Sequence, residues 1–343
     1  MRDIKLTQYS HGAGCGCKIS PKILDAIIGS NTMAEIDKNL IVGNSTKDDA
    51  AAYDLGNGQV IVSTTDFFMP IVDDPFDFGA IASVNALSDV YAMGARPLMA
   101  IAILGWPIDK IPPEVATEVL NGSRDVCKRA GISLAGGHSI DSPEPIFGLA
   151  ATGIVDKTLL KTNSSATEGS ALFLTKKLGV GIVTTAEKKG LAEVEHLKEI
   201  KISMKKLNDL GIWLGTKEYV NCLTDVTGFG LLGHLSEVCE AANLSAEVHF
   251  DSVPKFNFLQ SYLSQGCIPG GTNRNWESYG DKISLENETH KLVLADPQTS
   301  GGLLISVNHS SINQFKSEVQ ETGFELTQIG EITSRKEKLV YVN

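Results

Sequence analysis

Residues 77–94 read Asp77-Phe-Gly-Ala-Ile-Ala-Ser-Val-Asn85-Ala-Leu-Ser-Asp89-Val-Tyr-Ala-Met93-Gly94. The stretch is mostly small and apolar, so it predicts a buried helix over 77–93, with Asp77 as its N-cap and Gly94 as its stop. Asn85 and Asp89 are four residues apart and therefore share one face of this helix. A carboxylate on an otherwise apolar helix is costly unless it is paired or binds a metal ion, so Asp89 indicates a functional site.

Strands and helices are expected to alternate on both sides of this helix. Residues 60–65 are largely β-branched and predict a strand, with Asp66 at its C-terminal end. Further strands are expected at 97–105, 132–135 and 146–155, and an amphipathic helix at 112–130. The alternation predicts an α/β or α+β layer with helices on one face of a sheet.

A polar stretch at residues 161–169 interrupts this pattern and marks the expected domain boundary. We expect a glycine-rich N-terminal segment over 1–50, a first domain over 51–160 and a second α/β domain over 161–343. Strands of the second domain are predicted at 171–175, 222–225, 245–250, 303–307, 326–332 and 339–342.

Composition excludes several classes of protein. The chain has 343 residues, about two domains' worth, and its 42% hydrophobic and 21% charged residues are typical of a globular protein. The net charge of −11 argues against nucleic acid or an anionic membrane as a partner. The N-terminus lacks the apolar run of a signal peptide, and the six cysteines show no disulfide framework, so we expect reduced thiols and a cytoplasmic location.

The N-terminal segment contains the run Tyr9-Ser-His-Gly-Ala-Gly-Cys15-Gly-Cys17-Lys18. Three glycines favour a bend and a close approach to another group. A cation beside a thiol favours the thiolate, so the run predicts chemistry on a soft, nucleophilic atom. Two other interpretations stay open: half of a zinc site, although the other cysteines show no second half, and a glycine-rich tail.

Four aspartates fall beside predicted strand ends or on the buried helix: Asp49, Asp66, Asp89 and Asp225. Apart from Asp89, each alone is more typical of a cap or a turn. Together they would repel one another unless divalent cations lay among them, and Mg²⁺ often bridges carboxylates to phosphate oxygens, so they favour a Mg–nucleotide site. The familiar phosphate-loop and dinucleotide fingerprints are absent. Residues 136–139, Gly-Gly-His-Ser, are either backbone donors to a phosphate or a tight turn.

Taken together and in this order, the motifs resemble those of selenophosphate synthetases (selenide, water dikinases). The resemblance covers residues 5–335 and is carried by Gln8–Lys18, Thr46–Ala50, Thr64–Pro70, Asn85–Asp89, Gly136–Asp141, Thr224–Gly233 and Asp296–Gly302. The N-terminal motif is highly specific. The aspartate motifs are shared with a wider superfamily of ATP-binding enzymes that includes aminoimidazole ribonucleotide synthetase.

The resemblance implies an activity and a set of partners. ATP, hydrogen selenide and water would give selenophosphate, AMP and phosphate, for selenocysteine and selenouridine synthesis, with Mg²⁺ required and K⁺ stimulatory. It also implies a ferredoxin-like N-terminal half, a second α/β half, and a homodimer whose N-terminal halves form a shared β-barrel. A selenium-delivery protein is a further candidate partner.

The resemblance also assigns residues to roles. It implies that Cys15 and Lys18 are catalytic and that Asp49, Asp89 and Asp225 bind the metal. The implied nucleotide contacts are Lys18, Thr46, Lys47, Asp48, Asp66, Asp89, Gly137, His138 and Ser139. Lys47 stands where some members carry arginine, which would weaken a bidentate phosphate contact.

Two alternative functions remain at this point. One is another enzyme of the same superfamily, acting on a purine or thiamine precursor. The other is a non-catalytic carrier in which Gly-Cys-Gly-Cys binds zinc or a chalcogen.

Overall fold

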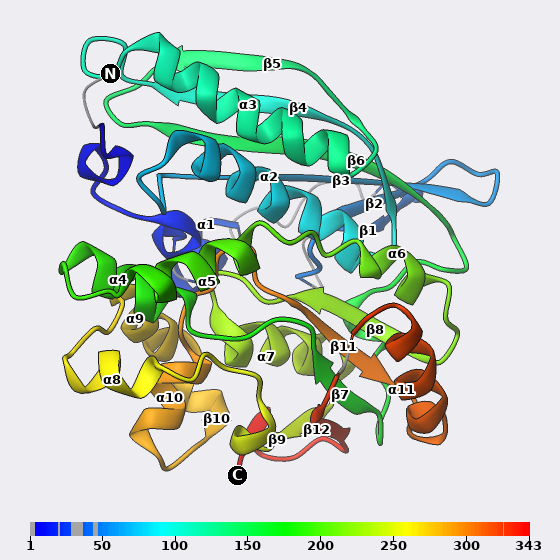
Figure 1. Ribbon diagram of the computed structural model, residues 1–343. Helices are drawn as coiled ribbons and strands as arrows, with labels where there is room; N and C mark the ends of the chain where they lie inside the picture. Colours follow the sequence, from blue (N-terminus) through cyan, green and yellow to red (C-terminus); the bar gives the residue numbers. More distant parts are fainter. Residues whose placement is uncertain (1–3, 20, 29–36, 44–46, 325) are drawn as a thin grey trace.

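The computed structural model describes residues 4–19, 21–28, 37–43, 47–324 and 326–343. It consists of two mixed α/β halves, each built on its own sheet and stacked on the other (Figure 1). The predicted combination of two α/β layers is thus confirmed. No helix in the described ranges combines the length and apolarity needed to cross a membrane.

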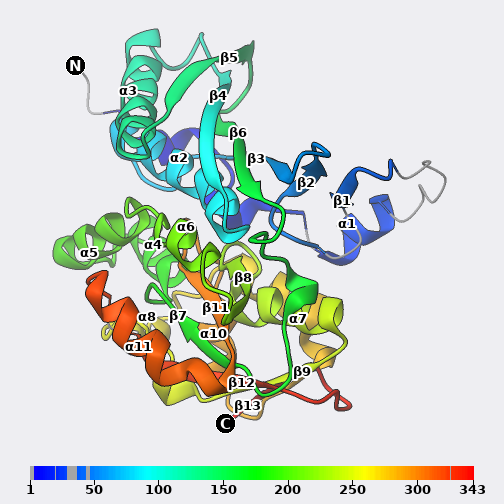
Figure 2. The same cartoon turned by 90° about the vertical axis from the view of Figure 1, so that its right-hand side faces the viewer.

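The first half contains a six-stranded sheet in the order β1-β2-β3-β6-β4-β5. Neighbouring strands are antiparallel except β4 and β5, which are parallel. The strands are β1 (Leu40–Val42), β2 (Ala51–Asp54), β3 (Gln59–Phe68), β4 (Arg96–Trp106), β5 (Ser133–Asp141) and β6 (Ile146–Asp156). Helices α2 (Pro75–Ala92) and α3 (Pro113–Arg129) cover one face, and the other face is open (Figure 2).

Helix α2 is the predicted buried helix, and it lies between the first sheet and the second half of the chain (Figure 1). Its N-cap is Asp74, whose side chain accepts a hydrogen bond from the backbone N–H of Asp77. The prediction that Asp77 caps the helix is therefore wrong, because Pro75 already occupies the first turn. Gly79 faces Val119 of α3 so closely that a Cβ atom would lie 1.8 Å from its carbonyl oxygen.

Two predicted strand limits in the first half were also wrong. Asp66 lies inside β3 rather than at its end, because pairing with β6 continues to Phe68. Residues 136–139 form part of the exposed edge strand β5 instead of a turn, because their backbone pairs with β4. Strand β2 was not predicted.

The second half contains a seven-stranded sheet in the order β10-β13-β9-β12-β7-β11-β8. Its strands are β7 (Ala171–Leu174), β8 (Val220–Asp225), β9 (Ser245–Val248), β10 (Ile283–Ser284), β11 (Leu303–Val307), β12 (Gln328–Thr333) and β13 (Val340–Val342). Strands β7 and β11 are wholly buried, which explains why they read as nearly continuous apolar runs.

Helices surround this sheet. They are α4 (Val180–Lys188), α5 (Val194–Met204), α6 (Leu210–Gly215), α7 (Gly230–Ala242), α8 (Leu259–Ser264), α9 (Gly270–Tyr279), α10 (Glu288–Leu294) and α11 (Ile312–Glu321). The short elements α6, α8, α9, α10 and β10 were not predicted. Short helices carry too few residues for an apolar period to stand out, and tertiary packing stabilises them instead.

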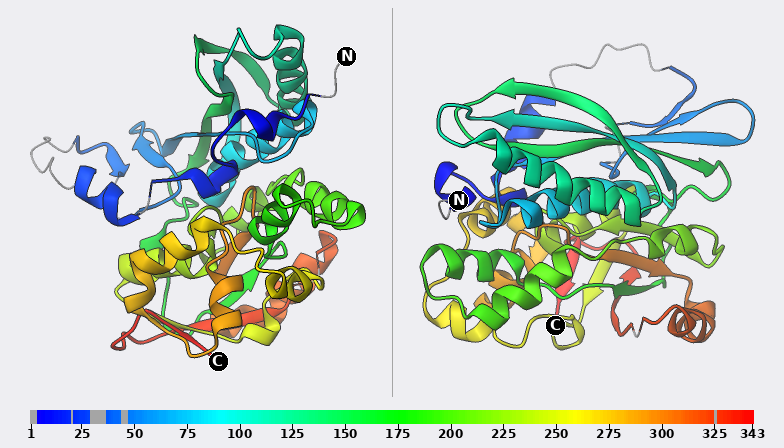
Figure 3. Two further views of the ribbon diagram at one scale, coloured as in Figure 1. Left: turned by 90° about the vertical axis from the view of Figure 1, so that its left-hand side faces the viewer. Right: turned by 45° about the horizontal axis from the view of Figure 1, so that its top comes forward.

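The N-terminal segment lies along the junction of the two halves (Figure 3). It forms two short 3₁₀ turns, Leu6–Tyr9 and Gly14–Cys17, followed by α1 (Pro21–Ile28). The backbone N–H of Gly14 donates to the carbonyl of Met69 in the first half, and that of Cys15 donates to Thr299 Oγ1 in the second. The segment therefore contacts both halves at once.

Candidate active site

Three carboxylates from distant parts of the chain meet where the halves join. Asp49 precedes β2, Asp89 lies on α2 and Asp225 ends β8. One oxygen of each lies within 4.8 Å of the others. Among the described residues this is the one group of three or more His, Cys, Asp or Glu side chains placed to hold a metal ion.

Hydroxyl groups fix the orientation of these carboxylates. Thr224 Oγ1 donates to Asp49 Oδ1 over 3.0 Å, and Thr64 Oγ1 donates to Asp89 Oδ2. Two further oxygens, Asp49 Oδ2 and Asp225 Oδ2, are buried and have no hydrogen-bond partner in the described structure. Burial, followed by repulsion from Asp225, raises the pKa values of Asp49 and Asp89 well above the usual range. Unpartnered oxygens among mutually repelling carboxylates fit a bound cation.

A second chain of contacts links the N-terminal segment to this cluster through Asn85. Asn85 Nδ2 donates to Asp66 Oδ2 over 2.6 Å, and that oxygen lies 3.7 Å from Lys18 Nζ. Asn85 Oδ1 accepts from the Cys15 thiol and from the backbone N–H of Ser300. The amide of one α2 residue thus sets the positions of the thiol and of the carboxylate that faces Lys18.

Side chains along β3 alternate between the two faces of the sheet, which explains why Asp66 points toward α2. Val60, Val62 and Phe68 are buried on one face of the strand, and Thr64 and Asp66 share that face because side chains alternate along a strand. These two side chains meet Asp89 and Asn85, which lie one turn apart on α2.

The expectation of a readily ionised thiol at Cys15 is not met. The side chain is 1% exposed, and burial followed by the charge of Asp66 raises the pKa of the thiol well above its usual value. Lys18 opposes this shift but does not outweigh it. Burial also lowers the pKa of Lys18, but the surrounding carboxylates, Asp66 first, outweigh that effect and hold its pKa above the usual range. The pair is therefore a neutral thiol and a cationic amine in this conformation.

The packing around Gly14 leaves no room for a side chain at this position. Its φ is +50°, and a Cβ atom there would lie 2.4 Å from Thr299 Oγ1 and 2.8 Å from Ile71 Cδ1. Gly16 is different, because a Cβ atom there would meet only Pro297, at 3.7 Å. Close approach to both halves thus requires glycine at position 14.

The carboxylate cluster opens into a cavity of about 500 Å³. Of the residues predicted to bind nucleotide or metal, it is lined by Lys18, Lys47, Asp48, Asp49, Asp66, Asp89 and Asp225. Asn163, in the polar stretch between the halves, donates to the Asp48 side chain and to the Lys47 carbonyl and so fixes the loop before β2. Thr46 lies outside the described residues.

Gly137, His138 and Ser139 do not join this cavity. They are exposed on β5, three strands from β3 in the sheet order. At a strand spacing of ~4.8 Å that separation is roughly 14 Å. Their predicted contact with the nucleotide remains a prediction.

Several residues that build the site had no predicted role: Thr64, Asn85, Thr224, Thr299 and Ser300. The sequence could have identified Asn85, because it lies four residues before Asp89 and therefore on the same face of the helix. The others are small hydroxyl residues whose partners come from distant elements, and no local pattern identifies them. The zinc alternative gains no support, because Cys15, Cys127, Cys222, Cys239 and Cys267 are all buried, free cysteines and none belongs to a metal-binding cluster in the described structure.

The burial of Cys15 gives a testable prediction. In a Cys17→Ser background, we expect iodoacetamide at pH 8 to alkylate Cys15 at least about 10-fold more slowly than free cysteine, because a buried, protonated thiol is a poor nucleophile. Gly14→Ala should raise the rate about 10-fold or more by forcing the segment away from Thr299, whereas Gly16→Ala should leave it unchanged. Mass spectrometry measures the rates, and equal rates in all three proteins would contradict the placement of the segment.

Comparison with known proteins identifies the family. Models of AIR synthase related proteins match the chain, the N-terminal domain over residues 47–155 and the C-terminal domain over 167–343. The structure of thiamine-monophosphate kinase from Stenotrophomonas maltophilia aligns with a TM-score of 0.66 at 19% identity, covering 90% of this chain and 92% of that one. The hydrogenase maturation protein HypE in complex with ATP aligns with a TM-score of 0.58 at 18% identity, covering 87% and 82%. These two likenesses show the fold.

The curated relatives are much more similar. A selenide, water dikinase from Photorhabdus laumondii is 56% identical over 340 residues, covering 99% of this chain and 98% of the relative. One from Sulfurovum sp. is 56% identical over 342 residues, covering all of both chains, and one from Escherichia coli O6:H1 is 56% identical over 329 residues, covering 96% and 95%. At this identity and coverage, the chain belongs to the selenide, water dikinase family.

Proposed function

We propose that this protein uses ATP, hydrogen selenide and water to form selenophosphate, AMP and phosphate. The observation that carries the proposal is the meeting of Asp49, Asp89 and Asp225 with Lys18 at one cavity between the two halves. The buried thiol of Cys15 is linked to this site through Asn85, which also binds Asp66. The high identity to selenide, water dikinases supports the same reaction. A non-catalytic carrier would have no use for a cluster of buried carboxylates, which destabilises a fold that lacks a bound cation.

The carboxylate cluster fits Mg²⁺. Its ligands are all oxygens, and two of them are buried without a partner in the described structure. Bound there by Asp49, Asp89 and Asp225, Mg²⁺ would neutralise charge on the polyphosphate of ATP. K⁺ remains a prediction for which the described residues offer no specific site.

Lys18 supplies a positive charge beside this cluster. Phosphoryl transfer depends on positioning and charge neutralisation more than on covalent chemistry. Asp66 holds the Lys18 ammonium group at the cavity wall, and the raised pKa keeps the amine protonated, so it can stabilise negative charge on the transferring phosphoryl group. Asp66, Asp48 and Lys47 line the same cavity and are proposed to orient the nucleotide.

Cys15 is proposed to receive or hold selenium once the N-terminal segment moves. In the present conformation its thiol is buried, protonated and bonded to Asn85. The segment covers the junction of the two halves and limits access of water to the transferring phosphoryl group. Water would otherwise compete with selenide for that group. Delivery of selenium by a partner protein remains a prediction.

The direct test is anaerobic ³¹P NMR of the purified protein with Mg–ATP, with and without selenide. We expect a new phosphorus signal split by selenium, together with AMP and phosphate, only when selenide is present. Formation of ADP, or turnover of ATP that ignores selenide, would instead identify another activity of the superfamily.

The metal site has its own test. We expect Asp225→Asn to reduce selenophosphate formation by about 10²-fold or more, because it removes a ligand of the ion that stabilises the transition state. The substitution should also abolish the rise in Tm that Mg²⁺ gives the wild type. The pKa of Asp225 is raised mainly by burial, so its ionised form opposes folding at neutral pH, and the metal-free variant should be at least as stable as the wild type.

Glu237→Gln is the matched control, since Glu237 lines the same cavity but lies outside the cluster. It should keep the Mg²⁺-dependent rise in Tm. An unchanged Mg²⁺ response in Asp225→Asn would place the ion elsewhere.

A homodimer is proposed from the open face of the first sheet. Phe67, Met99, Ile101 and Ile140 are exposed on strands of this sheet, with Met99 47% and Ile101 45% exposed. Apolar groups gathered on one face mark an interaction surface. Within one chain Gly137, His138 and Ser139 lie three strands from β3, which carries Asp66, and outside the cavity that Asp66 lines, so we infer that they contact ATP from a second copy.

Substitution on this face tests the dimer. We expect the wild type to elute with about twice the chain mass of 36.7 kDa in size-exclusion chromatography with light scattering, and Ile101→Asp to elute as a monomer, because a buried unpaired carboxylate disfavours the interface. Ile202→Asp, at an exposed position on α5, should leave the dimer intact. A monomeric wild type would exclude the proposed assembly.

A further inference from the structure

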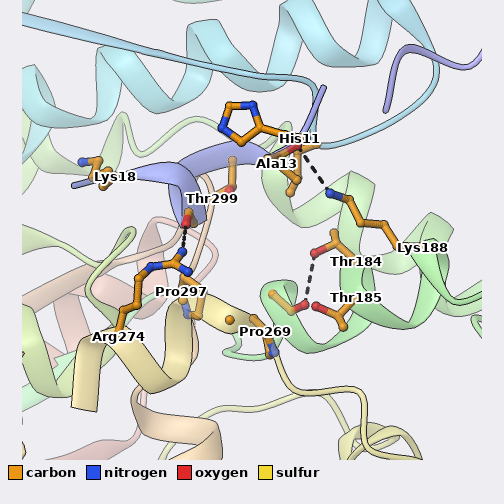
Figure 4. Close-up of a pocket in the computed structure, with 16 residues that line it drawn as sticks. His11, Ala13, Lys18, Thr184, Thr185, Lys188, Pro269, Arg274, Pro297 and Thr299 are labelled. Atoms are coloured by element: carbon orange, nitrogen blue, oxygen red, sulfur yellow. Dashed lines mark hydrogen bonds between the residues drawn. The ribbon is translucent and has the colours of Figure 1, made fainter. Parts of the chain in front are cut away.

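A second cavity, of about 510 Å³, adjoins the first at Lys18 (Figure 4). Its walls come from three places: the glycine-rich segment at His11–Lys18, the inner side of α4 near Lys188, and the start of α9 near Arg274. The volume is in the range of small-molecule sites. Apart from Lys18, no residue that lines this cavity has a role in the proposed binding of Mg–ATP.

The two cavities have opposite charge. The first is lined by six acidic residues: Asp48, Asp49, Asp66, Asp89, Asp225 and Glu237. The second has no acidic residue among those that line it and is lined by the cations Lys18, Lys188 and Arg274. The chain has a net charge of −11, yet the lysine and arginine side chains of this wall face no acidic side chain in it. This local excess of positive charge favours an anion as the ligand.

The two cations beyond Lys18 are not neutralised by neighbouring side chains. Lys188 Nζ donates to the carbonyl of Gly12 over 3.4 Å, and Arg274 Nη2 donates to the carbonyl of Gly16 over 2.7 Å (Figure 4). Neither forms an ion pair with a described carboxylate. Both side chains thus hold the segment through uncharged acceptors rather than through carboxylates.

The first turn of α9 adds to the positive potential. Gly270 and Gly271 line the cavity, and the first N–H groups of a helix have no acceptor within the helix. Gly270 is exposed, so the first turn of α9 presents its N-terminal end to the cavity. The start of α4 contributes less, because Gln298 and Asp296 already accept from the N–H groups of Val180 and Gly181.

We propose that this cationic cavity binds the anionic selenium substrate, hydrogen selenide as its monoanion, next to Lys18 and the buried thiol of Cys15, an inference that rests on the function proposed above. Mg–ATP is directed to the acidic cavity by its metal, and the selenium anion to the cationic one by Lys188 and Arg274. The two substrates then approach Lys18 from separate cavities.

Steady-state kinetics test the proposal. We expect Lys188→Gln and Arg274→Gln each to raise the KM for selenide about tenfold or more, with the KM for ATP within about twofold of the wild type, because each removes one charge from the selenide cavity alone. Arg274→Lys keeps the charge and should stay within about threefold of the wild type in both constants.

Matched controls separate charge from anchoring. Lys189 and Arg335 are exposed, and each donates to one backbone carbonyl outside both cavities. Lys189→Gln and Arg335→Gln should change neither KM. A parallel rise in both KM values for Arg274→Gln would show that Arg274 only positions the segment. An unchanged selenide KM with weakened inhibition by inorganic phosphate would assign the cavity to the product instead. Either result overturns the proposal.

Anaerobic calorimetry with sodium hydrogen selenide and no nucleotide gives a readout independent of turnover. A saturable heat of selenide binding in the wild type that is absent in Arg274→Gln would support selenide binding in this cavity. If ³¹P NMR then found no selenophosphate, only the proposed function would fail. Selenophosphate formation without saturable selenide binding would preserve the function and exclude the cavity.

Discussion

The site depends on the burial of two polar residues on α2, Asn85 and Asp89. The helix lies between the first sheet and the second half, so Asn85 is cut off from bulk water and Asp89 reaches it only through the cavity that it lines. Their partners come from β3, from the N-terminal segment and from the turn before β11. An unpaired buried amide or carboxylate is costly, so the site and the docking of these three parts form together.

The same constraint explains why so many carboxylates occur beside one another. Asp49, Asp89 and Asp225 are brought together by a loop, a helix and a strand whose positions are fixed by packing, and burial raises their pKa values. Such a cluster opposes folding when no cation is bound. Sites that carry function often keep an arrangement that stability alone would not favour.

Lys18 lines both cavities, the acidic one and the cationic one. One cavity beside it is acidic and suited to a metal–nucleotide complex, and the other is cationic and suited to a small anion. The glycine-rich segment carries Lys18 and Cys15 and is held by carbonyl acceptors on either side of the thiol, at Gly12 and Gly16. Each such charge-assisted hydrogen bond contributes only about 1.5–3 kcal/mol, so the segment can be released without disrupting either sheet.

The sequence by itself determined the two α/β layers, the buried helix and the aspartates that meet in the structure. Apolar periodicity and the cost of a buried carboxylate are local properties that can be read from a single strand or helix. It also determined the family, through the run from Gln8 to Lys18. The protonated state of Cys15, the edge-strand position of Gly137–Ser139 and the hydroxyl partners of the carboxylates were decided only by the tertiary structure. The electrostatic and hydrogen-bonding environment of a side chain depends on neighbours hundreds of residues away, such as Thr299 beside Cys15, and no local pattern encodes that distance.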